Sequence, residues 1–343
     1  MDTLAFRVAG HGLAAYGDDP LGALRGWAVQ DSPPGSAAAA VVARARSVAP
    51  GWVELAIYEQ RTAVALYNAR TATAVVPADE VAAFGTALAP TDDAGLKAIA
   101  GSALPELDKG FAEPVALAVE AISDALDGVT LSRDDLHEGL RQRLPQAMLP
   151  WCPSCKSHHA RRGLLVMAAL RGRLCIAGRA GRQPAFARTD QLVGWDPPAD
   201  AGAELVRRYL RGYGPSTPPH FAQWAGLGNA HAKKLWALTE YEPPDPQPAE
   251  GVRLLATGDP LLLGRDRERL LPDPEARKKV WAAVGGAGVV LVDGEATALW
   301  RARKQGKRLE VTVEGKVPKR AVQAEAERLA PHRGCTAVTV AYG

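Results

Sequence analysis

Residues 161–187, RRGLLVMAALRGRLCIAGRAGRQPAFA, decide the fold. The segment 161–171 is apolar and contains no proline, which predicts a helix. Two short apolar runs follow at 174–177 and 185–187. The glycine-rich segment GRAGR at 178–182 joins them, which is typical of a β-hairpin. A helix followed by such a hairpin is the last part of a helix-turn-helix unit with a wing.

Two further helices are expected ahead of this segment. Residues 115–126 are amphipathic, and TLSRDD at 130–135 is a capping signature for a second helix that ends near Leu144. Three helices and then a hairpin predict a winged helix within residues 91–194.

The predicted fold class is mainly α with small β-hairpin wings (α+β), in the form of tandem winged-helix units plus a C-terminal α+β unit. Proline-rich linkers and changes of hydrophobic period give the expected boundaries. The expected domains are a first winged-helix-like unit at 1–90, the second winged-helix unit at 91–194, a third helix-turn-helix or winged-helix unit at 195–250, and the α+β unit at 251–343.

Composition places few limits on function. The 343 residues are 47% hydrophobic and carry a formal net charge of +3, so a polyanionic partner has to be argued from local charge. No run of eighteen apolar residues predicts a membrane span, and residues 1–10 lack the features of a signal peptide. We therefore expect a cytoplasmic protein, associated with the nucleoid and without a membrane partner. The sequence sets no oligomeric state.

Basic residues gather between residues 156 and 188, where Asp and Glu are absent. Arginines on the third helix and on the wing of such a unit contact phosphates and groove edges, so we expect double-stranded DNA as the partner. A solvated basic face is the alternative. The residues predicted to bind DNA are Arg161, Arg162, Arg171, Arg173, Arg179, Arg182 and Arg188.

Cys152 and Cys155 form a CxxC pair, and His159 follows closely. Two thiolates and an imidazole supply three of the four tetrahedral ligands that zinc requires, so a structural zinc ion is expected here. His137, Cys175 or a water is the fourth ligand in this interpretation. Two reduced cysteines in a loop are the alternative.

Gln30, Asp31 and Ser32 precede an alanine-rich helix. A glutamine beside an acid can position and polarise a water, which makes these three residues the candidate catalytic group. The structural alternative is that Asp31 or Ser32 caps the following helix.

Several stretches together resemble the winged-helix DNA-binding family that includes AlkZ-like bacterial DNA glycosylases. They are 27–32, 213–217, 221–227, 258–267 and 290–301. The resemblance implies three winged helices around a basic channel and a catalytic Gln-x-Gln or Gln-x-Asp. That pair holds the water that attacks an N7-alkylated nucleotide, and no cofactor is required for the reaction.

The chain departs from the family pattern at two places. Ser32 stands where the family has Gln or Asp, and the segment RTATA at 70–74 lacks the family's histidine. We therefore expect a DNA-binding protein of DNA repair whose glycosylase activity is reduced or lost. The first alternative is an active, monofunctional glycosylase that excises N7-alkylated purines or crosslinks. The second is a winged-helix scaffold for protein interactions.

Overall fold

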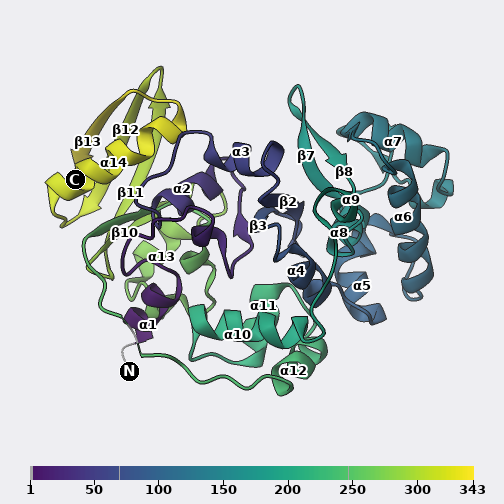
Figure 1. The fold of residues 1–343 in the computed structure, drawn as a ribbon, viewed down its shortest axis with the longest axis horizontal. Helices are drawn as coiled ribbons and strands as arrows, with labels where there is room; N and C mark the ends of the chain where they lie inside the picture. The colour runs from purple at the N-terminus through teal and green to yellow at the C-terminus, as the bar shows by residue number, and fades with distance from the viewer. Residues whose placement is uncertain (1–2, 69, 246) are drawn as a thin grey trace. The chain divides into compact units, whose positions relative to one another are not determined.

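The computed structural model describes residues 3–68, 70–245 and 247–343 (Figure 1). The chain divides into two compact units, and each combines segments that are far apart in the sequence. Unit 1 consists of Met1–Val53, Arg207–His220 and Tyr241–Gly343, and unit 2 of Glu54–Val206 and Phe221–Glu240. The four consecutive domains expected from the sequence remain a prediction.

Unit 1 is built around a five-stranded sheet. Its helices are α1 (Thr3–Gly10), α2 (Ser36–Val42), α13 (Pro274–Val280) and α14 (Lys319–Leu329). The strand order is β13 (Ala337–Tyr342), β12 (Arg308–Gly315), β11 (Glu295–Gln305), β10 (Gly288–Val292) and β9 (Val252–Leu255). The pair β12 and β13 is parallel and the other pairs are antiparallel. The strands β9 to β13 all come from the segment 251–343, but the unit they belong to also contains Met1–Val53 and Arg207–His220.

Both faces of the sheet are buried at β9 and β10, where successive side chains point to opposite faces and nearly all are buried. Val290 belongs to the core that α14 covers, whereas its neighbours Val289 and Leu291 belong to a second core. In that second core they pack with Val8 and Leu13. The residues before Val53 are therefore part of the same folded unit as the last strands of the chain.

Unit 2 combines helices with short antiparallel strands. The helices within it are α4 (Val81–Leu88), α5 (Asp93–Ala100), α6 (Ala112–Ala125), α7 (Arg133–Arg141), α8 (Arg162–Leu170), α9 (Thr189–Val193) and α12 (Asn229–Ala237). Five of its strands follow the order β3 (Thr73–Pro77), β2 (Ala63–Tyr67), β7 (Cys175–Ala180), β8 (Gln183–Ala187) and β4 (Leu131–Ser132). The boundaries between the segments of unit 1 and those of unit 2 fall within three further helices. These are α3 (Trp52–Tyr58), α10 (Ala201–Tyr213) and α11 (Pro218–Ala225).

Helix α8 lies in the interior of unit 2. Residues 163–170 are all buried, as expected for a helix that is apolar on every side. Helices α5 and α6 pack against it. A Cβ atom at Gly163 would lie 2.4 Å from the Ile99 carbonyl oxygen, so glycine permits the close approach of α5. The helix and the hairpin expected at 161–187 are thus both present.

The helices among the described residues include none with the length and apolar composition needed to cross a bilayer.

Candidate functional site

Gln30 and Ser32 contact each other at the end of a short strand in unit 1. Strand β1 (Val29–Gln30) ends at Gln30, whose Nε2 donates a hydrogen bond to the Ser32 carbonyl oxygen at 2.6 Å. Gly258 adopts φ +86°, and a Cβ atom there would lie 3.5 Å from Gln30 Nε2. The amide end of Gln30 is thus fixed, and no hydrogen bond to its Oε1 is formed by any residue that the structure describes.

Asp31 has a structural role in this loop. Its Oδ1 accepts hydrogen bonds from the backbone amides of Gly35 at 2.8 Å and Ala37 at 3.0 Å, at the start of α2. A carboxylate in this position satisfies amides that the helix leaves without partners, and it interacts favourably with the helix dipole. The capping alternative derived from the sequence therefore describes Asp31.

A cavity of about 290 Å³ adjoins the same loop. Pro33 and Ser36 line it from the loop side, and Arg301 and Arg333 line it as well. The Nε of Arg333 is buried and has no hydrogen-bond partner. Burial lowers the pKa of Arg333, and the Asp31 carboxylate opposes this shift. Two basic residues therefore border the cavity beside the Gln30 loop.

Sequence reasoning missed a buried ion pair that supports this part of unit 1. Arg44 binds Asp259 through two hydrogen bonds of 2.7 and 2.8 Å, and the two side chains are 3% and 0% exposed. From the sequence, Arg44 fits the end of a helix. The signal for its partner was the GDP segment at 258–260, which the resemblance includes without assigning it a role.

His11 is a second buried polar residue that the sequence did not reveal. Its ring stacks on Trp27 at 4.3 Å between centroids, and its Nδ1 donates to the Arg7 carbonyl oxygen at 2.9 Å. Burial is the largest effect that lowers the pKa of His11, to about 3. The imidazole is therefore neutral at physiological pH.

The seven arginines predicted to bind DNA lie in different environments of unit 2. Arg179 and Arg182 are exposed at the tip of the β7–β8 hairpin, and no described residue forms an ion pair with either. Arg173 and Arg188 both bind Asp190, just beyond the acid-free run. These two guanidinium groups are therefore partly neutralised within the unit.

The other three arginines lie at the ends of α8. Arg161 donates to the carbonyl oxygens of Ser102 and Trp151, and Arg162 lies 5.2 Å from the centroid of the Tyr67 ring. Arg171 is half-buried, which lowers its pKa. Residues 163–170 of α8 are buried and form no polar face. The positive charges associated with this helix therefore lie at its two ends.

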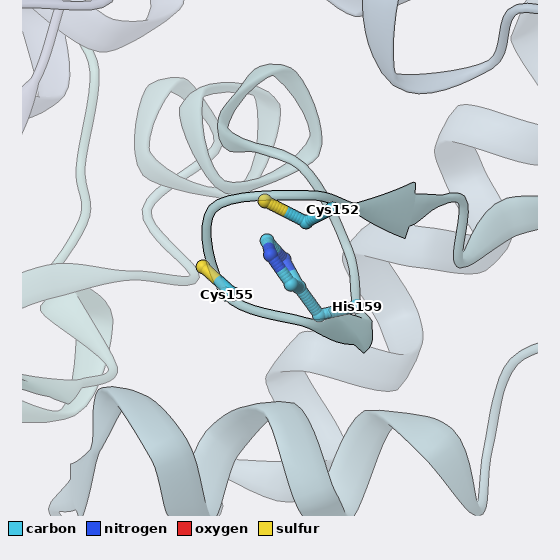
Figure 2. A group of neighbouring side chains, drawn as sticks. All are labelled: Cys152, Cys155 and His159. Carbon is cyan, nitrogen blue, oxygen red and sulfur yellow. The ribbon is translucent and has the colours of Figure 1, made fainter.

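Cys152, Cys155 and His159 come together at a small hairpin of unit 2. Figure 2 shows the His159 ring pointing into the loop that carries the two cysteines. The ligand atoms of the three residues all lie within 4.8 Å of one another. A hydrogen bond from the Cys155 backbone is the largest effect that lowers the pKa of the Cys152 thiol, to about 7. By contrast, Cys175 is buried in β7, where burial raises its pKa to about 11.

Comparison with known proteins identifies the family. The family model described as "DNA glycosylase AlkZ-like" matches residues 23–332. The chain is 28% identical over 254 residues to the "Interstrand DNA cross-link repair glycosylase" of Streptomyces sahachiroi, and the match covers 64% of this chain and 67% of the relative. Its structure is similar to Streptomyces sahachiroi DNA glycosylase AlkZ, with a TM-score of 0.74, 22% identity, and coverage of 100% of this chain and 98% of the other. At this identity the structural likeness concerns the fold alone.

The match of the family model to most of the chain confirms the resemblance that the motifs predicted. DNA repair and DNA as substrate follow from the family. The chain belongs to the AlkZ-like DNA glycosylase family.

Proposed function

We propose that the chain is an active DNA glycosylase that releases N7-alkylated purines, crosslinked ones included, from double-stranded DNA. The family and the crosslink-repair relative favour this alternative over the reduced or lost activity expected from Ser32. The order α6, α7, α8 and the β7–β8 hairpin in unit 2 is that of a winged helix, and the exposed arginines at the tip of this hairpin support DNA binding. An action on chromosomal DNA would place the protein at the nucleoid in the cytoplasm.

The observation that carries the proposal is the hydrogen bond from Gln30 to the Ser32 carbonyl oxygen. With Nε2 engaged there, Gln30 Oε1 accepts a hydrogen bond from a water, and the exposed Ser32 hydroxyl is a second group for the same water. An N7-alkylated purine carries a positive charge and leaves readily, so the water needs position more than a strong base. In this scheme Asp31 fixes the loop, and the reaction requires no cofactor.

The test is release of N7-methylguanine from a duplex oligonucleotide with one such base. We expect release by the wild-type protein above the uncatalysed rate, and a reduction of about a hundredfold to a thousandfold by Gln30→Ala, as for loss of one positioning group. Gln323→Ala, in α14 of the same unit, is the control and should leave the rate unchanged. Equal turnover by wild type and Gln30→Ala would place the active site elsewhere. Intact DNA binding without any release would restore the interpretation of lost activity.

Two gain-of-function variants locate the partner of Gln30. Positions 28 and 32 both lie two residues from Gln30, which is the spacing of a Gln-x-Gln pair. Ser32→Gln should raise the release rate if the water lies between Gln30 and position 32. A rise with Ala28→Gln instead would move the water to the other side of Gln30.

A further inference from the structure

The hairpin that carries the two cysteines is too small to be stable on its own. Its strands β5 (Trp151–Cys152) and β6 (Ser157–His158) have two residues each, and among the described strands each pairs with no other partner. The Trp151 side chain is 50% exposed, so little apolar surface is buried here. Isolated two-stranded hairpins are marginally stable at best, and a cross-link commonly holds such segments in place.

We propose that Cys152, Cys155 and His159 bind one zinc ion that holds this hairpin together. Their ligand atoms already lie within 4.8 Å of one another, close to a common centre (Figure 2). Two thiolates and one imidazole are a donor set that selects zinc among the common divalent cations. All four cysteines of the chain are free, so no disulfide competes for these two sulfurs.

The hydrogen bonding of His159 fixes which ring nitrogen faces the metal. Nδ1 lies 2.9 Å from the Ala160 carbonyl oxygen, which only accepts hydrogen bonds, so Nδ1 carries the proton. Nε2 then has a lone pair, and this atom is buried without a hydrogen-bond partner. Histidines that bind metals usually donate their other nitrogen to a carbonyl or carboxylate in this way. The unpartnered Nε2 is therefore the expected third donor.

His137 is the side chain best placed to support the site. Its ring centroid lies 4.5 Å from that of His159, and its Nδ1 is also buried without a partner. It comes from α7, whereas Cys175, the other fourth ligand considered from the sequence, lies in β7. His137 thus packs against the His159 ring, and a solvent molecule would complete the four ligands. Removal of His137 should therefore weaken metal binding by loosening the position of the His159 ring.

The zinc would fix the hairpin between two helices of unit 2. Arg141 at the end of α7 donates to the His158 carbonyl oxygen at 3.1 Å. Arg161, immediately before α8, donates to the Trp151 carbonyl oxygen at 3.3 Å. An ordered hairpin therefore holds the first turn of α8, where Arg161 and Arg162 lie. The role is structural, and it does not depend on glycosylase activity.

Metal analysis of the full chain tests this proposal. After loading with zinc and dialysis against metal-free buffer, the wild-type protein should retain about one zinc per chain. Cys152→Ser and Cys155→Ser should lose it, whereas Cys335→Ala, at a buried cysteine of unit 1, should retain it. Replacement by Co²⁺ should give thiolate charge-transfer bands and the intense d–d bands of a tetrahedral ion. His137→Gln should weaken zinc binding by roughly tenfold to a hundredfold.

The wild-type protein also provides a test that needs no variant. Removal of zinc with a chelator should make two additional thiols reactive and should lower the melting temperature. A reduced wild-type protein that retains no zinc, or one with a Cys152–Cys155 disulfide and no metal, would overturn the proposal. Equal zinc content in Cys152→Ser and wild type would do the same. Unchanged affinity in His137→Gln would remove His137 from the site and leave the three-ligand centre.

Discussion

Asp31 lies between two candidate catalytic residues, yet its carboxylate is committed to the start of α2. Replacement of a capping residue by alanine typically lowers stability by about 0.5–2 kcal/mol. We expect this loss of unfolding free energy for Asp31→Ala, and a release rate per folded molecule within a few-fold of wild type. Asp31→Asn keeps a capping oxygen and should recover most of the stability. Denaturant unfolding and base release, measured side by side, check this. Near-complete loss of release by folded Asp31→Asn would instead give the carboxylate a catalytic role.

His11 predicts a dependence of stability on pH. Its pKa is about 3 in the folded protein and 6.5 in the unfolded chain. Between these values the unfolded chain binds the extra proton, so the free energy of unfolding falls as the pH drops below about 6.5. One group contributes a slope of at most about 1.4 kcal/mol per pH unit. Urea unfolding of the wild type at pH 7.5 and 5.5 should show this decrease.

His11→Gln is the matching variant, because glutamine does not titrate in this range. It should be less stable than wild type at both pH values, since the stacking on Trp27 is lost. Its stability should nevertheless change less between pH 7.5 and 5.5. The same pH dependence in both proteins would exclude His11 as the source.

The β7–β8 hairpin is the element on which DNA affinity is expected to depend most. Arg179→Ala with Arg182→Ala should weaken duplex binding and reduce the slope of log K against log salt by about 1–2, because each phosphate contact contributes about 0.9. Lys97→Ala with Lys278→Ala removes the same charge from exposed positions that pair with acids. This control should bind nearly as wild type. Equal salt slopes in all three proteins would argue against the wing as a contact.

Elements with a strong local signal were predictable from the sequence. The helices expected at 115–126 and 161–171 correspond to α6 and α8, because apolar period and capping act within a few residues. The burial of α8 on all sides followed from its composition as well, yet the interpretation as a recognition helix overlooked it. The arginines at the two ends of α8 leave residues 163–170 buried, so this helix has no exposed face that could enter a DNA groove.

At the scale of the whole molecule, local patterns were a poor guide. Arg44 and Asp259 are separated by 215 positions, and Val8 packs in one core with Val289. No spacing rule links residues so far apart, so neither the ion pair nor the composition of unit 1 was predictable. The Cys152, Cys155 and His159 cluster was predictable because its members are seven positions apart at most. The site around Gln30 was predictable only in part. Its loop is formed by neighbouring residues, whereas Arg333 and Gly258 lie far from that loop in the sequence.

The composition of unit 1 also has a consequence for synthesis of the chain. Val8 and Leu13 are translated early, but their partners Val289 and Leu291 emerge from the ribosome about 280 residues later. At roughly 5–20 residues per second this interval is on the order of 15–60 s. During that time the apolar side chains near the amino end have no core to enter, which is the situation in which chaperones bind nascent chains. The loop at Gln30 acquires all its surroundings only when translation has passed Arg333, so a prematurely terminated product would have this loop without its complete unit.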